Sequence, residues 1–244
     1  MVFFRSMESL QTITIDNISC IKSYYGVYLR TKWTDATFLF CCLGRYGDRF
    51  SDYLDSLETD FTFIDIGANQ GLYTLIAARN PRCQDVIAFE PVADSYEYLQ
   101  DNLRINRAGN KVRTVNAAVS DVTGNTEIAV KPGHSGAASL RSTKAAWFTR
   151  TETIKTVNAE QLQTTLAGTT NCIIKIDVEG HELTVIRELL NAGVLSRSAA
   201  VYYEIDEDWV NTEQIQQLLM SCGFTHFESI GTGTHYDVLA VRDL

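Results

Sequence analysis

The chain has 244 residues, 45% of them hydrophobic and 21% charged, which is ordinary for one globular domain with a single core. Its formal net charge of −9 disfavours a nucleic-acid partner, which would require a basic face, and agrees better with a neutral or cationic small substrate. The apolar run 36–43 is far shorter than the roughly 20 residues of a membrane span, and Met1–Ser6 is too short for a secretory signal. We therefore expect a cytoplasmic protein whose six cysteines, which lack metal-ligand spacing, stay reduced.

Residues 1–60 precede the first clear strand–helix unit. Aromatic and β-branched residues gather around 13–18, 24–29 and 37–43, and a helix-like run follows from about 48 to 57. We interpret this region as an N-terminal cap on the sheet of a domain that spans 61–244.

From Phe61 onward, strand-like and helix-like runs alternate, which predicts βαβ units and a mostly parallel α/β sheet. The expected strands are 62–66, 85–90, 112–116, 172–177, 199–204, 225–229 and 236–241. Four helices are expected. The first spans 71–79 and the second starts at about 93. The third includes 183–190 and ends at Gly193, and the fourth runs from an N-cap at Asn211 to Gly223. Only five residues separate the last two strands, so they predict an antiparallel hairpin.

Residues 122–157 interrupt this alternation. Strand-like segments at 126–130 and 153–157 flank a middle rich in Gly, Ser and Ala. Long insertions on the ligand side of such a sheet are often lids or substrate loops, and we predict that role here.

The segment 63–71 predicts a strand, a glycine turn and a helix N-terminus, where open α/β sheets bind nucleotide-like cofactors. Gly67, Asn69 and Gly71 form the turn, and Asp65 precedes it by two residues. A carboxylate there would repel a pyrophosphate, whereas it suits the ammonium and sulfonium of S-adenosylmethionine. The turn therefore predicts S-adenosylmethionine as the cofactor.

Further polar residues follow the next two strands. Glu90 lies 25 residues after Asp65, where a carboxylate accepts hydrogen bonds from both ribose hydroxyls. Ser120 and Asp121 follow the third strand, where an adenine edge would lie. Asp121 either accepts from the adenine amino group or caps a turn, and the sequence favours neither role.

The densest polar cluster follows the fourth strand and contains Asp177, Glu179 and His181. Glu204 ends the fifth strand. These four residues are the candidate catalytic bases and substrate anchors, because an alcohol needs a base and in-line positioning to accept a methyl group. Their oxygens can also hold a divalent cation, but no ligand spacing is recognisable and we expect no metal site.

Structural roles compete with catalytic ones in this cluster. Glu182 begins a helix, where a carboxylate stabilises the N-terminal dipole. His181 can be a surface residue at the same helix start. Lys175 lies inside the strand and must pair with a carboxylate if it is buried.

These motifs together resemble the FkbM-type family of S-adenosylmethionine-dependent methyltransferases. The resemblance covers about 61–204 and rests on the segments 63–71, 88–91, 116–121 and 174–182. It implies a Rossmann-like, doubly wound sheet of seven strands whose last strand is antiparallel, and O-methylation of hydroxyls on sugars, glycans or natural products. One departure is Asn158, where the family usually has Asp, although Asn caps a helix equally well.

The preferred interpretation is a methyltransferase acting on a small-molecule or glycan hydroxyl. A nicotinamide-dependent oxidoreductase is the first alternative, but the glycine turn lacks the G-x-G-x-x-G pattern. The second is a non-catalytic cofactor-binding or scaffold protein that retains the pocket.

Overall fold

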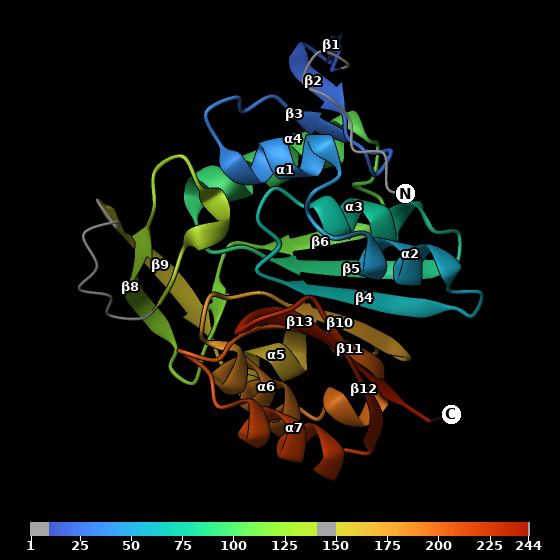
Figure 1. Cartoon of the computed structure of the whole chain (residues 1–244), viewed down its shortest axis with the longest axis vertical. Coiled ribbons are helices and arrows are strands. Elements are labelled where there is room, and N and C mark those ends of the chain that lie inside the picture. The colour runs from blue at the N-terminus through green and yellow to red at the C-terminus, as the bar shows by residue number, and fades with distance from the viewer. Residues whose placement is uncertain (1–9, 141–149, 244) are drawn as a thin grey trace.

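The computed structural model describes residues 10–140 and 150–243 and has a central seven-stranded sheet (Figure 1). In chain order its strands are β4 (Phe61–Ile66), β5 (Cys83–Phe89), β6 (Val112–Val115), β10 (Cys172–Ile176), β11 (Ser198–Asp206), β12 (Phe224–Ile230) and β13 (His235–Arg242). Across the sheet the order is β12-β13-β11-β10-β4-β5-β6. β13 runs antiparallel to both of its neighbours, and the other pairs are parallel. The predicted mostly parallel sheet with an antiparallel C-terminal hairpin is therefore confirmed.

Helices cover both faces of this sheet, as Figure 1 shows. One layer contains α3 (Leu72–Arg79) and α4 (Ala93–Ile105), and the other contains α5 (Ala159–Thr165), α6 (Glu182–Asn191) and α7 (Thr212–Ser221). Side chains alternate between the two layers along a strand, so Phe63 joins the core under α3 and Ile64 joins the core under α6. Every residue of β4 and β10 is buried, which explains why both strands are mostly apolar without a polar–apolar alternation.

The expected helix boundaries follow local chemistry. Asn211 caps α7 by accepting from the backbone N–H of Gln214. Asn158 forms a capping box with Gln161 at the start of α5, so Asn does replace Asp as a cap there. Among the described residues, no helix has both the length and the apolar character to cross a lipid bilayer.

The N-terminal region packs on the α3 and α4 side of the sheet. Its elements are β1 (Thr12–Ile15), β2 (Ile18–Lys22), β3 (Tyr28–Arg30), α1 (Ala36–Leu43) and α2 (Asp48–Ser56). The segment 37–43, which we grouped by composition with strand-forming segments, is helical. Asp35 caps this helix and Gly44 ends it in the left-handed conformation, with φ of 74°. Asn102 of α4 and Asn106, which caps the C-terminus of that helix, bind β3 by accepting from its backbone N–H groups.

The insertion forms a small sheet beside the carboxyl ends of the parallel strands (Figure 1). Its strands are β7 (Ala118–Val119), β8 (Gly124–Val130) and β9 (Arg150–Val157), in the order β7-β9-β8. A short 3-10 turn at Ser135–Ala137 follows β8. This turn lies at the site described next.

Candidate active site

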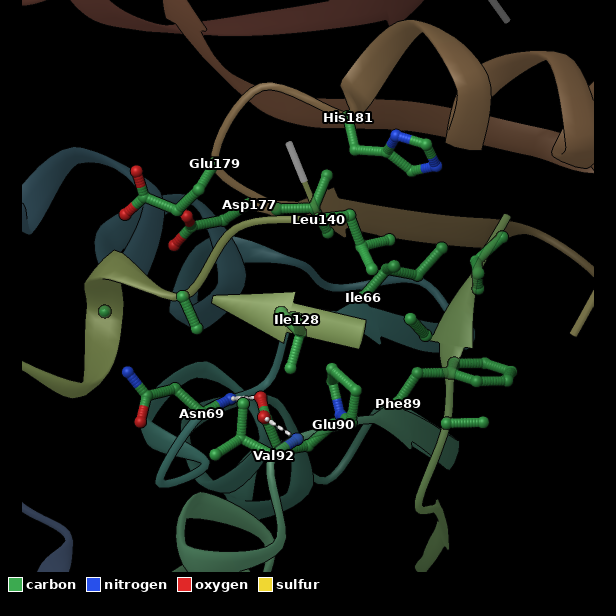
Figure 2. Close-up of a pocket in the computed structure, with 18 of the residues that line it drawn as sticks. Ile66, Asn69, Phe89, Glu90, Val92, Ile128, Leu140, Asp177, Glu179 and His181 are labelled. Atoms are coloured by element: carbon green, nitrogen blue, oxygen red, sulfur yellow. Dashed lines mark hydrogen bonds between the residues drawn. The ribbon is translucent and has the colours of Figure 1, made fainter. Parts of the chain in front are cut away.

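Two adjoining pockets lie at the carboxyl ends of the parallel strands. The first, the glycine-loop pocket, contains about 590 Å³ of space and opens between the main sheet and the insertion (Figure 2). Its lining residues are Ile66, Gly67, Asn69, Phe89, Glu90, Pro91, Val92, Ala117, Ala118, Val119, Ile128, Ser135, Gly136, Ala138, Leu140, Asp177, Val178, Glu179 and His181. The pocket therefore combines apolar walls with a few polar groups, as small-ligand sites do.

The glycine turn is required by a close approach between two strand ends. A Cβ atom at Gly67 would lie 1.9 Å from the backbone oxygen of Asp177, and the φ of Gly67 is 80°. Gly71 starts α3 with φ of 84°, and a Cβ there would lie 2.4 Å from Leu99. A side chain at Gly67 would force a backbone shift, and one at Gly71 would adopt a strained φ and displace the Leu99 side chain.

Asp65 does not line the glycine-loop pocket. Because side chains alternate along β4, Ile66 faces the pocket and Asp65 faces α3. There Asp65 accepts from the Thr74 hydroxyl at 2.6 Å and lies 3.5 Å from the Lys175 ammonium. The Asp65 side chain thus makes internal contacts in this structure, and its assignment to the cofactor stays a prediction. Burial raises the pKa of Asp65.

Lys175 connects the glycine turn to the acidic cluster. Its buried ammonium donates to the Gly67 carbonyl at 2.7 Å and lies 3.2 Å from the Asp177 carboxylate. Burial alone would lower the pKa of Lys175, but the carboxylates of Asp177 and Asp65 hold it above its ordinary value. The expected pairing of this strand lysine with carboxylates is present.

Glu90 projects into the glycine-loop pocket with a fixed orientation (Figure 2). One carboxylate oxygen accepts from the backbone N–H of Asn69 at 2.7 Å, and the other accepts from Val92 N–H at 2.9 Å. Each oxygen keeps a further lone pair for a ligand. Burial raises the pKa of Glu90 to about 7.

Asn69 also lines this pocket, with a backbone φ of 50° that is uncommon outside glycine. Its side-chain oxygen and nitrogen are buried and have no hydrogen-bond partner among the described residues. Buried amides without partners are rare in proteins. This side chain is therefore suited to bind a polar ligand in the pocket.

His181 groups with Ser120 and Asp121, away from the other candidate bases. Its Nε2 lies 3.1 Å from the Ser120 hydroxyl, which donates to Asp121 at 3.2 Å. Since that hydroxyl has one proton, Nε2 must be the donor to Ser120, which leaves Nδ1 as an acceptor in the neutral ring. Burial lowers the pKa of His181 and favours this neutral form. Ser120 and Asp121 do not themselves line the pocket.

Glu182 has the structural role considered for it. Its carboxylate accepts from the backbone N–H groups of Val178 and Gly180, and its side chain is buried. Glu182 therefore fixes the turn after β10.

The second pocket, the acidic pocket, shares the residues Gly136, Asp177 and Glu179 with the first. Its lining residues are Thr37, Phe40, Tyr46, Tyr73, His134, Gly136, Ala137, Asp177, Glu179, Tyr202, Glu204, His235 and Asp237. The shared residues place the two pockets in direct contact. None of the described lining residues is a lysine or arginine.

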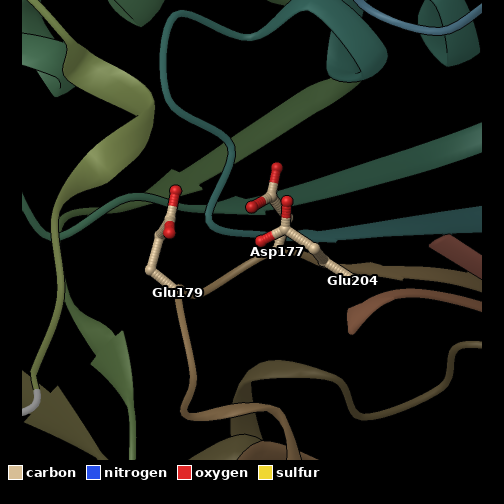
Figure 3. Close-up of side chains that lie close together, drawn as sticks. All are labelled: Asp177, Glu179 and Glu204. Atoms are coloured by element: carbon tan, nitrogen blue, oxygen red, sulfur yellow. The ribbon is translucent and has the colours of Figure 1, made fainter. Parts of the chain in front are cut away.

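Three of the four candidate bases meet in this pocket (Figure 3). One carboxylate oxygen each from Asp177, Glu179 and Glu204 lies within 4.8 Å of the others. Burial and the neighbouring Glu204 raise the pKa of Glu179 to about 9, and burial also raises the pKa of Glu204. Such a cluster can accept protons from hydroxyls, bind polyols or coordinate a divalent cation.

Several lining residues were missed by the sequence analysis. The Tyr46 hydroxyl donates to Asp177 at 3.4 Å, and His235 lies 2.8 Å from Glu204. A hydrogen bond with Glu204 raises the pKa of His235 to about 9. The sequence did contain a signal for the residues of β13. Because β13 runs antiparallel to β11, the first residues of β13 lie beside the last residues of β11. The polar start of that strand, His235 and Asp237, therefore had to lie beside Glu204. Tyr46 carried no comparable signal.

A profile of the methyltransferase FkbM domain matches residues 65–225. The chain belongs to this family. The resemblance drawn from the sequence motifs is therefore confirmed at the level of the family.

Two curated relatives of the chain agree with that membership. The chain is 29% identical over 139 residues to hexuronic acid methyltransferase AglP of Haloferax volcanii, covering 57% of the chain and 54% of the relative. It is also 29% identical over 98 residues to methyltransferase sdnD of Sordaria araneosa, covering 39% of the chain and 38% of the relative. The chain thus spans about half or less of the length of these relatives.

A solved structure shows the same fold. The methyltransferase FkbM from Methylobacillus flagellatus KT superimposes with a TM-score of 0.53 and 16% identity, covering 84% of this chain and 52% of that one.

Proposed function

We propose that this methyltransferase uses S-adenosylmethionine, bound in the glycine-loop pocket, to methylate a hydroxyl of a sugar, glycan or other small molecule in the acidic pocket. The observation that carries this proposal is the pair Asp177 and Glu179, which line both pockets. A methyl donor in one pocket can meet an acceptor in the other only at such a junction.

The residues of the glycine-loop pocket fit this cofactor. Glu90 offers two oriented carboxylate oxygens to ribose hydroxyls. Phe89, Ala118 and Val119 supply an apolar surface for a base. The unpartnered amide of Asn69 is available to the polar amino-acid end. When bound, S-adenosylmethionine supplies an electrophilic methyl group on a sulfonium.

The chain's own contribution to the reaction is to orient the acceptor and take its proton. Asp177 is held by Tyr46 and Lys175, so its carboxylate is oriented before an acceptor binds. No residue that the structure describes anchors the Glu179 carboxylate in this way, and its raised pKa of about 9 favours the protonated form at neutral pH. Asp177 is therefore our first choice for the base, and Glu179 for a donor to the acceptor.

Sugars are the favoured class of acceptor. The relative AglP is named for a hexuronic acid, and carboxylates beside tyrosines form the hydrogen-bonding and stacking surface that polyols require. Binding of a divalent cation by Asp177, Glu179 and Glu204 would lower the pKa of an acceptor hydroxyl.

Calorimetry separates this function from its alternatives. We expect the chain to bind S-adenosylmethionine and S-adenosylhomocysteine but not NAD. Glu90→Ala should weaken binding at least about tenfold, because two charge-assisted hydrogen bonds of roughly 1.5–3 kcal/mol each are lost. Mass spectrometry of a hydroxylated panel should then show the gain of one methyl group. Binding without any turnover would favour the scaffold alternative, and an unchanged affinity in Glu90→Ala would contradict the ribose assignment.

A further inference from the structure

Asp35 binds donors from three separate parts of the chain. One carboxylate oxygen accepts from the Phe38 backbone at 2.9 Å, the Gln70 side chain at 3.1 Å and the Ser135 hydroxyl at 3.0 Å. The other oxygen accepts from the backbone N–H of Ser135 at 2.8 Å. Asp35 is only 1% exposed, so these contacts are shielded from water. A single buried carboxylate thus joins α1, the glycine turn and the insertion.

A helix cap alone does not need these contacts. At the start of α7, Asn211 accepts from Gln214 within its own helix. Asp35 makes the equivalent bond to Phe38 and, in addition, binds residues 35 and 100 positions away along the chain. One additional partner, Ser135, lines the glycine-loop pocket, and the other, Gln70, follows the lining residue Asn69 in the glycine turn.

The turn at Ser135–Ala137 is the part of the insertion that Asp35 holds. Ser135 lines the glycine-loop pocket, and Gly136 lines both pockets. A second bond supports the same turn, because the Gly136 N–H donates to the Thr37 hydroxyl at 3.1 Å. A Cβ atom at Gly136 would lie 2.9 Å from that hydroxyl, so the turn sits directly against α1.

We propose that Asp35 is a positioning residue of the methyl-donor site. It fixes the Ser135–Ala137 turn against the glycine loop, and this turn retains the cofactor in its pocket. The assignment rests on the proposed use of S-adenosylmethionine. Asp35 touches neither the reacting atoms nor the pocket itself, and it acts through Ser135 and Gln70.

Asp35→Asn is the sharpest test. Asn keeps the cap, because its oxygen can still accept from Phe38, but its amide nitrogen then faces the Ser135 N–H as a second donor. We expect the dissociation rate of S-adenosylhomocysteine, measured by stopped flow on the full chain, to rise at least fivefold. Hydrogen exchange at the Ser135 amide should accelerate in parallel, even without ligand.

Two further variants keep the test decisive if Asp35→Asn folds poorly. Thr37→Val keeps the side-chain shape but removes the acceptor for Gly136 N–H, and Ser135→Ala removes one donor to Asp35. Both should speed ligand release, by less than Asp35→Asn. The matched control is Asn211→Ala, which removes a cap far along the chain and should lower the melting temperature without changing the release rate.

The outcomes separate this proposal from the proposed function. A wild-type chain that binds no S-adenosylmethionine or S-adenosylhomocysteine would overturn both. A wild-type chain that binds them, with unchanged release in Asp35→Asn and Thr37→Val, would overturn only the role of Asp35 and leave it a helix cap.

Discussion

Glu90 is ionisable, buried and oriented by two backbone N–H groups, so its titration should be visible in stability. Its pKa is raised from 4.5 to about 7, which means that the fold favours the protonated form. The contribution of protonated Glu90 to the free energy of unfolding is therefore complete below about pH 4.5 and is lost as pH rises towards 7. Glu90→Gln cannot ionise, and we expect a flatter pH dependence of the free energy of unfolding in urea between pH 5 and 7. An identical slope in the variant and the wild type would contradict this pKa.

The same group should make cofactor binding depend on pH. Ribose hydroxyls donate best to an ionised carboxylate, so Glu90 must lose its proton before S-adenosylmethionine binds. Below pH 7 we expect the affinity for S-adenosylmethionine to fall, by at most about tenfold per pH unit. Calorimetry at several pH values checks this, with Glu90→Gln as the control that should bind weakly at every pH.

Asp177 is the residue at which the chemistry can be tested. Asp177→Asn keeps the shape of the side chain but removes the negative charge and the ability to take a proton. Turnover should fall by about a hundredfold or more while cofactor affinity stays within a few-fold. A wild-type rate would exclude Asp177 as the base and make Glu179→Gln the next variant to measure. His181, also a candidate base from the sequence, is tested after Glu179, because it lies with Ser120 and does not line the acidic pocket.

At the scale of elements, the sequence identified the sheet well because its strands are distinctive. β4 and β10 are short, mostly apolar segments, and the short link before β13 permits only a hairpin. The carboxyl ends of parallel strands meet at one edge of a sheet, and this rule explains why Asp177, Glu179 and Glu204 lie close together. These predictions needed only local patterns and one rule of topology.

Contacts between distant segments could not be predicted in this way. The direction of Asp65 depends on which face of β4 it occupies, and an apolar run buried on both faces has no alternation to show it. The role of Asp35 depends on residues 70 and 135 meeting it in space. The segment 37–43 was grouped with other segments rich in aromatic and β-branched residues and was not recognised as a helix. The residues that cap this helix, Asp35 and Gly44, lie just outside the segment.

The insertion gives a prediction at this scale. Five of its described residues line the glycine-loop pocket, which is the proposed cofactor site: Ile128, Ser135, Gly136, Ala138 and Leu140. Replacing 132–137 with a short glycine-containing turn should therefore weaken S-adenosylmethionine binding at least about tenfold and abolish methylation. Calorimetry measures the first effect, and circular dichroism should show an intact fold. Unchanged cofactor affinity with lost turnover would restrict the insertion to the acceptor site.

For the whole molecule, negative charge is concentrated where the acceptor is proposed to bind. The chain has a net charge of −9, and the carboxylates of Asp177, Glu204 and Asp237 line the acidic pocket beside Glu179, whose raised pKa favours its protonated form. The pKa of Asp237 is raised to about 6 by burial, so that group is mostly ionised at neutral pH. His235 and Lys175 compensate part of this charge. An anionic acceptor would therefore be opposed by both the pocket and the surface.

This charge distribution predicts which acceptors are preferred. The relative AglP is named for a hexuronic acid, but the described walls of the acidic pocket offer no lysine or arginine to a uronate. For whichever sugar scaffold gains a methyl group, we expect the neutral and amino forms to react at least about tenfold faster than the matching uronate at low salt. The difference should shrink as added salt shortens the screening length from about 30 Å at 0.01 M to about 8 Å at 0.15 M. Mass spectrometry of the three matched acceptors at both salt concentrations measures this ratio. A uronate that reacts faster at low salt would show that the carboxylates of the acidic pocket do not face the acceptor. The acidic pocket would then be excluded as the acceptor site.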